Sequence, residues 1–123
     1  MFEGNANAAM NFYISLFPDS KIVSNTLYQE NESGTAGTIK QATFSLNGQT
    51  FMCIDSFVKH AFTFTPSMSL FVNCETEDEV LRLFNALSES GNILMPLAAY
   101  PFAKKYAWLT DKFGISWQLS FNQ

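Results

Sequence analysis

The chain has 123 residues, which is enough for one domain or for two small subdomains that share a core. Hydrophobic residues make up 47% of the chain and charged residues only 15%, a composition that excludes an intrinsically disordered protein. The formal net charge is −4 and no basic cluster extends beyond Lys104-Lys105, which excludes a surface that follows the phosphates of a nucleic acid.

The first predicted element is an amphipathic helix between Asn5 and Pro18. Asn5 is of a type that caps helix N-termini, and Pro18 ends the helix because the residue before a proline disfavours the helical conformation. Helical spacing places six apolar side chains on one face: Ala6, Ala9, Met10, Tyr13, Leu16 and Phe17.

Three strands are expected next. Residues 21–29 alternate weakly between apolar and polar side chains, and the polar, glycine-bearing segment 31–37 predicts a loop. Residues 38–46 alternate cleanly, and Asn47-Gly48 is a strong signal for a two-residue hairpin turn. The returning strand then covers residues 49–55.

The crossing segment 56–66 contains the only histidine and leads to a strand over residues 67–74. Thr76 to Glu79 form a capping box that begins a second helix, which Gly91 ends. The apolar stripe of this helix is Val80, Leu81, Phe84 and Leu87.

The last predicted elements are three strands, of which the final two form a hairpin. A short strand over residues 92–97 is followed by a proline-bounded loop over residues 97–102. Strands over residues 104–110 and 115–121 form the final hairpin, and at its turn we expect Asp111 to accept backbone N–H groups.

The two halves of the chain repeat one pattern. Gly48 opens Gly-Gln-Thr-Phe-Met-Cys-Ile and Gly114 opens Gly-Ile-Ser-Trp-Gln-Leu-Ser, each across a turn from another strand and downstream of a helix. This duplication predicts an α+β fold of paired βαβββ modules, because each apolar sheet face needs its own helix. The modules cover about residues 1–56 and 67–123, with a linker over about 57–66. Only Met1-Phe2-Glu3 remains for the first opening strand, which we expect to be truncated.

Two further sequence features bear on the cellular compartment. No apolar run approaches the ~20 residues that cross a membrane, and no export signal is recognisable, so we expect a cytoplasmic protein. Cys53 and Cys74 lie in apolar segments without C-x-x-C spacing, and we expect both to be reduced, packed thiols.

The order of elements resembles the vicinal-oxygen-chelate superfamily, which includes glyoxalase I, bleomycin-resistance proteins and extradiol dioxygenases. The resemblance is closest to its PhnB-like branch, which often carries the label demethylubiquinone methyltransferase-like. It implies modules that form a U-shaped mixed sheet around a cleft, and a homodimer. The residues that carry it span nearly the whole chain: Phe2-Glu-Gly-Asn-Ala6, Phe12-Tyr13, Leu16-Phe-Pro-Asp-Ser20, Leu46-Asn-Gly-Gln49, His60-Ala-Phe-Thr-Phe-Thr-Pro-Ser67, Val72-Asn-Cys-Glu-Thr76 and Trp108-Leu-Thr-Asp-Lys-Phe-Gly-Ile-Ser-Trp-Gln118.

The resemblance also implies where a metal would bind, namely at the opening and last strands of each module. A divalent metal needs about three His, Glu, Asp or Cys donors aimed at one point. The matching positions here are Met52, Gln118, Ser67 or Ser69, and Phe2 or Glu3. They offer at most one carboxylate, one amide and one hydroxyl, so we expect neither a metal nor another cofactor. Methyltransferase activity is not expected either, because the chain lacks a G-x-G turn for a nucleotide-type methyl donor.

Strand alternation predicts which side chains face the cleft. If Trp117 and Leu119 pack beneath the helix, then Gln118 points the other way. The predicted ligand-binding residues are Met52, Ile54, Ser69, Phe71, Tyr106, Trp108, Gln118 and His60, and no catalytic residue is predicted. These rings, hydroxyls and amides suit a small organic ligand, and the alternative is that they close a filled core or a dimer seam.

His60 allows two interpretations. It is of the only side-chain type that titrates near neutrality, so it can be a general base at the mouth of the cleft with Asp55 as its partner. Alternatively, it is a loop residue that hydrogen-bonds backbone carbonyl groups beneath Phe62 and Phe64.

The sequence therefore predicts a metal-free, homodimeric protein that binds a small hydrophobic or aromatic molecule of unknown identity. One alternative is a divalent-metal-dependent isomerase, lyase or dioxygenase. The other is a dimeric scaffold that binds no ligand.

Overall fold

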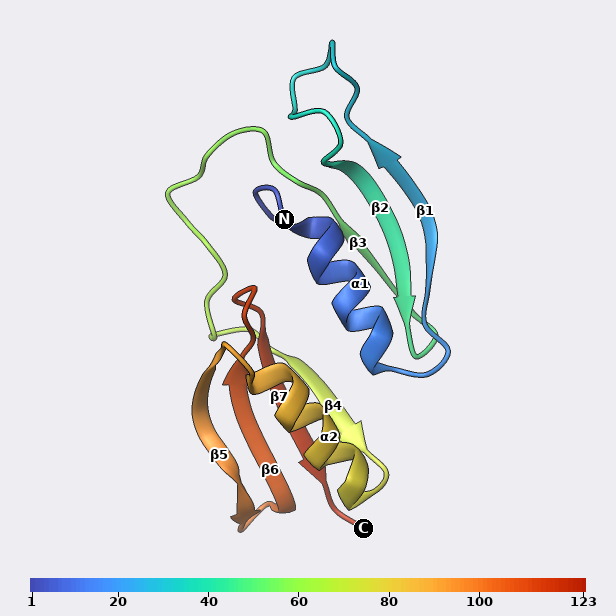
Figure 1. The fold of residues 1–123 in the computed structure, drawn as a ribbon. Helices are drawn as coiled ribbons and strands as arrows, with labels where there is room; N and C mark the ends of the chain where they lie inside the picture. The colour runs from blue at the N-terminus through green and yellow to red at the C-terminus, as the bar shows by residue number, and fades with distance from the viewer. The chain divides into compact units, whose positions relative to one another are not determined.

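The computed structural model describes all 123 residues, and the chain divides into two compact units, unit 1 (Met1–Ala61) and unit 2 (Phe62–Gln123). Each unit contains one helix that lies against one face of one sheet (Figure 1). The two helices, of 11 and 12 residues, are too short to span a bilayer.

Unit 1 consists of α1 (Ala6–Leu16), β1 (Lys21–Leu27), β2 (Ile39–Leu46) and β3 (Gln49–Cys53). The strands form an antiparallel sheet in the order β1-β2-β3, and α1 contacts its central strand. The predicted stripe of α1 is buried except for Phe17, which is half-buried just beyond the helix end. Burial of one such side chain, Met10, contributes about 1.5–3 kcal/mol of transfer free energy.

The opening strand of unit 1 is reduced to a single bridge, which confirms the predicted truncation. Phe2 pairs in parallel with Asp55. The Phe2 N–H donates to the carbonyl of Ile54 at 2.8 Å, and the Ser56 N–H donates to the carbonyl of Phe2 at 2.7 Å.

The Asp55 carboxylate fixes this end of unit 1. Its Oδ1 accepts the N–H groups of Gly4 at 2.8 Å and Ala6 at 3.0 Å, and its Oδ2 accepts that of Ile39 at 2.9 Å. The prediction that the side chain of Asn5 caps α1 is wrong, because that side chain makes no capping bond. The carboxylate of Asp55, just beyond the end of β3, accepts the first N–H of the helix instead. Its negative charge also suits a helix N-terminus.

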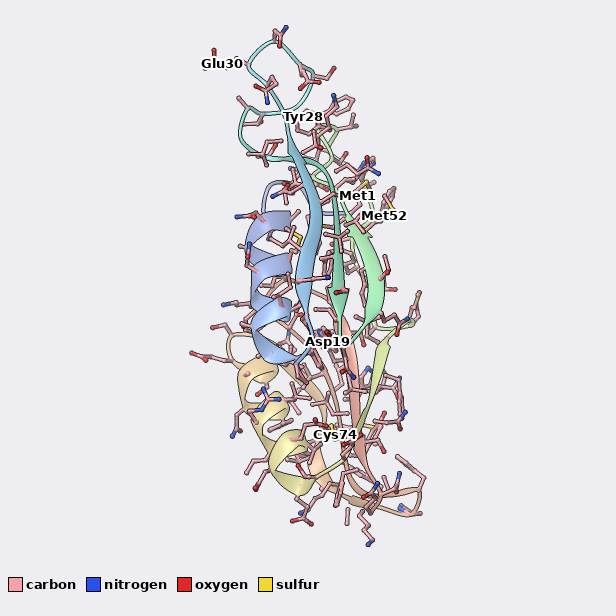
Figure 2. The ribbon with its side chains drawn as sticks, turned by 90° about the vertical axis from the view of Figure 1, so that its right-hand side faces the viewer. Met1, Asp19, Tyr28, Glu30, Met52 and Cys74 are labelled. Carbon is pink, nitrogen blue, oxygen red and sulfur yellow. The ribbon has the colours of Figure 1, made fainter.

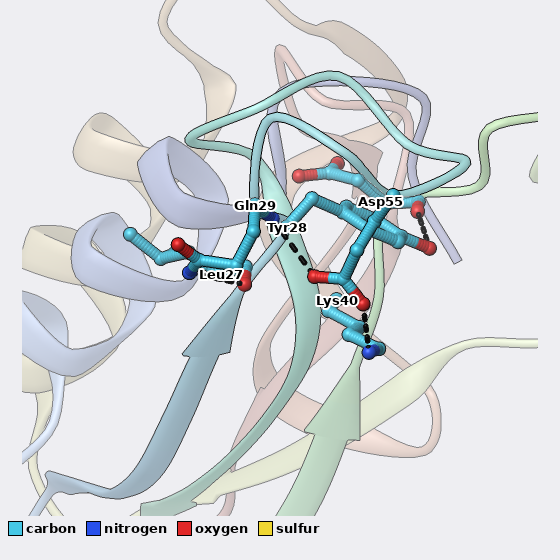
Figure 3. Close-up of polar contacts among 6 residues, drawn as sticks. Leu27, Tyr28, Gln29, Lys40 and Asp55 are labelled. Carbon is cyan, nitrogen blue, oxygen red and sulfur yellow. Dashed lines mark hydrogen bonds and ion pairs between the residues drawn. The ribbon is translucent and has the colours of Figure 1, made fainter.

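The predicted polar loop after β1 is confirmed and is closed by its own hydrogen bonds (Figure 3). The Tyr28 N–H donates to the Thr38 carbonyl at 2.9 Å. Glu32 accepts the Gln29 N–H at 2.8 Å and forms an ion pair with Lys40. This bond from Lys40 lowers the pKa of Glu32 and raises that of Lys40.

Unit 2 repeats the architecture of unit 1 with a complete opening strand. It consists of β4 (Leu70–Cys74), α2 (Glu77–Ser88), β5 (Asn92–Tyr100), β6 (Ala103–Thr110) and β7 (Ser116–Phe121). The sheet order is β4-β7-β6-β5, in which β4 runs parallel to β7 and the other pairs are antiparallel. Unit 1 has the same order, with Phe2 in the place of β4, so the predicted α+β fold of paired modules is confirmed.

Helix α2 has the predicted N-terminal cap, but its buried face differs from the predicted one. The Thr76 hydroxyl accepts the Glu79 N–H at 3.0 Å, as predicted, but the buried residues are Val80, Leu83 and Leu87. Leu81 is 49% exposed, because it lies outside the face that the i, i+3, i+7 spacing defines.

The glycine after α2 is required by packing and not by a left-handed conformation. Ser90, not Gly91, has the positive φ angle, of 61°. A Cβ atom on Gly91 would overlap the carbonyl oxygen of Thr110 on β6.

Two strand boundaries in unit 2 also differ from the sequence prediction. β5 continues to Tyr100, into the segment 97–102 where a loop was expected. Pro96 does not interrupt it, because an edge strand tolerates a residue without an N–H group. β4 begins only at Leu70, although a strand was predicted from residue 67, and Met68 is 79% exposed.

Candidate ligand-binding face

The sheet of unit 2 has one apolar face beneath α2 and one mixed face on the opposite side. Trp117, Leu119 and Leu109 are fully buried, and α2 contacts β6 and β7. Alternation along the strands therefore turns Gln118 and Trp108 to the other face, as predicted.

Residues at paired positions of neighbouring strands form rows across this mixed face. Gln118 on β7 pairs with Phe71 on β4 and with Trp108 on β6, and Trp108 pairs with Met95 on β5. Phe71 is 55% exposed, whereas Trp108 and Gln118 are half-buried. An amide thus lies between two aromatic residues, each one strand away.

The next row contains Asn73, Ser120, Tyr106 and Ala98, and the row on the other side contains Ser116 and Thr110. None of the residues in these three rows is charged. We call the three rows together the mixed face.

Hydrogen bonds connect the polar groups of the mixed face. The Tyr106 hydroxyl donates to Oε1 of Gln118 at 2.6 Å, and the Trp108 indole N–H donates to the Ser116 hydroxyl at 2.9 Å. The hydroxyl oxygens of Ser116 and Ser69 are 2.7 Å apart, so these two groups are also hydrogen-bonded. These contacts hold the side chains in fixed orientations.

Tyr106 is the most deeply buried ring of the mixed face. Burial, and to a lesser degree the nearby Tyr100, raises the pKa of its hydroxyl, so the group stays protonated and donates its hydrogen. Its ring makes edge contacts with Tyr100 and Phe102, at centroid distances of 5.7 Å and 4.9 Å.

The structure brings five of the eight predicted site residues together in unit 2, namely Ser69, Phe71, Tyr106, Trp108 and Gln118. Their role in binding a ligand stays a prediction. The predicted ligand-binding residues did not include Ser116, which joins Trp108 to Ser69. Its position two residues before Gln118 was the available signal, because alternate residues of a strand share a face.

Two other predicted site residues, Met52 and Ile54, belong to unit 1. Met52 is 60% exposed and lies on the side of the sheet away from α1 (Figure 2). Ile54 is half-buried beyond the end of β3, and its carbonyl accepts the Phe2 N–H. That these residues share a cleft with the mixed face stays a prediction.

His60, also in unit 1, contacts a hydroxyl group. Its Nε2 lies 2.9 Å from the hydroxyl oxygen of Ser56, which also bonds the N–H and carbonyl of Val58. Backbone N–H groups bond both oxygens of the Asp55 carboxylate, and the pairing of His60 with Asp55 stays a prediction. That His60 also hydrogen-bonds backbone carbonyl groups stays a prediction.

Asp111 forms the expected turn and one further bond. Its Oδ1 accepts the N–H groups of Phe113 at 2.8 Å and Ile115 at 3.1 Å, which confirms the prediction. Its Oδ2 accepts the indole N–H of Trp117 at 2.8 Å. The two tryptophans therefore have different hydrogen-bond acceptors and lie on opposite faces of the sheet.

Both cysteines are free and buried. Burial raises the pKa of the Cys53 thiol, and it raises that of Cys74, with a further contribution from Glu79, to about 12. Neither is a reactive thiolate near neutral pH. No three His, Cys, Asp or Glu side chains come together in either unit.

The repeated βαβββ architecture is the fold of a glyoxalase-related enzyme and of a fosfomycin resistance protein. A glyoxalase-related enzyme from Fulvimarina pelagi is 22% identical, with a TM-score of 0.58, over 99% of this chain and 84% of its own. The fosfomycin resistance protein FosX from Listeria monocytogenes is 8% identical, with a TM-score of 0.62, over 100% of this chain and 88% of its own. At these identities the likeness concerns the fold alone.

The chain belongs to the PhnB-like family described as 3-demethylubiquinone-9 3-methyltransferase, whose family model matches residues 1–120. It is similar to a putative 3-demethylubiquinone-9 3-methyltransferase, PhnB protein, from Bacillus cereus. The two are 61% identical, with a TM-score of 0.97, over 98% of this chain and 94% of the other. No curated protein matches the chain.

Proposed function

We propose that this protein binds a small organic molecule on the mixed face of unit 2 without the help of a metal ion. The observation that carries the proposal is the row Phe71, Gln118 and Trp108, in which a half-buried amide lies between two aromatic residues. Small-molecule sites combine apolar contact area with a few fixed polar groups, and this row has both.

The oxygen atoms of the mixed face are poor ligands for a metal ion, which supports binding without one. The Gln118 amide oxygen already accepts the Tyr106 hydroxyl, and the Ser69 hydroxyl is bonded to Ser116. Neutral oxygens with hydrogen-bond partners compete poorly with carboxylates and imidazoles for a divalent ion. Met52, which occupies the corresponding position of unit 1, would offer only a soft thioether.

The proposal assigns no methyl transfer to this chain, although the family description names it. A nucleotide-type methyl-donor site uses a glycine-rich turn between a strand and a helix of a parallel sheet. The sheets here are antiparallel except for the pair β4 and β7.

Intrinsic fluorescence tests this proposal, because Trp108 is a reporter on the mixed face. We expect small aromatic compounds to change the emission of the wild-type protein saturably, and Trp108→Phe to lose most of that change. Trp117, beneath α2, remains in the variant as the control fluorophore. No saturable change with any compound would refute binding and favour a scaffold without a ligand.

Elemental analysis tests the metal-free part separately. We expect protein purified without chelator to contain far less than one equivalent of any transition metal. One equivalent of manganese, zinc, nickel or iron per chain would instead favour a metal-dependent isomerase, lyase or dioxygenase. The FosX structure is described as a complex with Mn(II), so this outcome has a precedent in the fold.

We further propose a homodimer. Edge strand β1 exposes Ile22, Val23 and Leu27, and edge strand β5 exposes Ile93 and Leu94, so apolar side chains stand on strands with an unpaired side. Light scattering after size-exclusion chromatography should give twice the chain mass of 13.8 kDa. A mass of one chain at micromolar concentration would contradict the proposal.

A further inference from the structure

We infer that the ligand of the mixed face is an uncharged planar compound, aromatic or conjugated, with a carbonyl-type oxygen that accepts a hydrogen bond from Gln118. This inference rests on the proposed function and names the chemical class that the same face selects.

The hydroxyl of Tyr106 sets the orientation of the Gln118 amide. The Tyr106 hydroxyl has one hydrogen, and the distance of 2.6 Å to Oε1 of Gln118 is typical of an O–H···O bond. With Oε1 as the acceptor, the amide nitrogen is turned away from Tyr106, and its two N–H groups have no partner in the protein. The half-buried Gln118 therefore presents hydrogen-bond donors to a ligand.

The indole N–H of Trp108, beside Gln118, is already used within the protein. The only N–H of the Trp108 indole is bonded to Ser116, and the hydroxyl of Ser116 is bonded to Ser69. Next to Gln118, Trp108 thus offers apolar ring surface and no free donor. The complementary group on a ligand is an oxygen acceptor on an otherwise apolar body.

The surroundings of Gln118 disfavour a charged ligand. The three rows of the mixed face hold no charged side chain. Lys104 shares this side of β6, but it is four residues from Trp108, which corresponds to roughly 13 Å along the strand. A carboxylate over Gln118 would lose hydration without gaining a counter-charge, and the net charge of −4 also disfavours it. A neutral carbonyl carries neither penalty.

Aromatic residues on the two neighbouring strands favour a planar ligand. Phe71 and Trp108 are each one strand away from Gln118, at the ordinary spacing of about 4.8 Å between strands. A ligand bonded to the amide lies between these two aromatic residues. Planar groups gain the most from contact with rings on both sides, which selects an aromatic or conjugated body.

Three probes of nearly the same shape, each with one ring, test the need for a carbonyl and for neutrality separately: acetophenone, α-methylstyrene and benzoate. The first has a carbonyl, the second replaces it with a C=CH2 group, and the third carries a charge. The two indole N–H signals in a nitrogen-15 NMR spectrum report binding, because Trp108 lies on the mixed face and Trp117 beneath α2.

We expect acetophenone to shift the Trp108 signal and to bind roughly three- to tenfold more tightly than α-methylstyrene, the effect of one hydrogen bond. Benzoate should bind more weakly than acetophenone, and the Trp117 signal should move little. Gln118→Met, which keeps the side-chain length, should abolish the preference for the carbonyl. The matched variant Gln49→Met, at an exposed position of β3 in unit 1, should retain this preference.

Tyr106→Phe tests the positioning of the amide. Without the hydroxyl, the amide is free to rotate, so the preference for acetophenone should shrink while α-methylstyrene still binds. Equal binding of acetophenone and α-methylstyrene to the wild type, or tighter binding of benzoate, would overturn the inference and leave the proposed function standing. No shift of Trp108 with any of the three probes would overturn both.

Discussion

Removal of the Asp55 carboxylate should destabilise unit 1 severely. In Asp55→Ala, the N–H groups of Ala6 and Ile39 lose their buried acceptor, and that of Gly4 loses a half-buried one. A hydrogen bond to a charged group contributes about 1.5–3 kcal/mol, and a buried donor left without an acceptor costs about 1–3 kcal/mol. We therefore expect a loss of about 3–5 kcal/mol, a large share of the 5–15 kcal/mol that typical domains have.

The variant Asp55→Asn removes the charge and only one of the two acceptor oxygens. The amide oxygen can still accept the N–H groups of Gly4 and Ala6, but the new NH2 group faces the N–H of Ile39. Two donors then oppose each other at one of the three bonds, so we expect an intermediate loss of about 2 kcal/mol.

Urea unfolding followed by far-UV circular dichroism measures both losses. The midpoint of Asp55→Ala should fall by at least about 1 M, given slopes of about 1–3 kcal/mol per molar urea. Glu30→Ala, which removes an exposed carboxylate from the loop after β1, should stay within about 0.5 kcal/mol of the wild type. If Asp55→Ala also stayed within 1 kcal/mol, roughly the size of one ordinary hydrogen bond, the anchoring role of Asp55 would be refuted.

Three further predictions concern unit 2. Asp111→Ala should lower the free energy of unfolding by about 2–4 kcal/mol and move the indole N–H signal of Trp117, since that group loses its acceptor; an unmoved signal would contradict the bond. Gly91→Ala should cost about 1–3 kcal/mol in thermal or urea unfolding, because the added Cβ overlaps the Thr110 carbonyl, and a neutral result would show that the strand moves aside easily. Cys74 should resist iodoacetamide near pH 8 until the protein unfolds, because its pKa is about 12 in the folded chain; rapid labelling of native protein would contradict its burial. The same raised pKa means that the unfolded chain loses this proton first, so stability should fall as the pH rises from about 9 towards 12.

Local patterns were sufficient to predict much of the fold. The Asn47-Gly48 turn, the capping residue Thr76 and the alternation along residues 116–121 each depend on neighbours in the sequence, and the structure contains all three. Alternation likewise placed Gln118 and Trp108 opposite the buried Trp117.

The predictions that failed depend on residues far apart in the chain. Asp55, 49 residues from Ala6, serves the helix N-terminus that Asn5 was expected to cap. The prolines on either side of residues 97–102 predict a loop there, but only sheet order shows that β5 is an edge strand in which Pro96 is tolerated. No local pattern contains either fact.

The most direct test of the account is a crystal structure of the protein purified from cell extract without chelator. We predict density for a small organic molecule over Gln118, between Phe71 and Trp108, with an oxygen within hydrogen-bond distance of the amide nitrogen and no anomalous signal from a metal. An anomalous peak from a transition metal bound at Gln118 and Ser69 would contradict the account. So would a mixed face that is sealed by side chains of the protein itself.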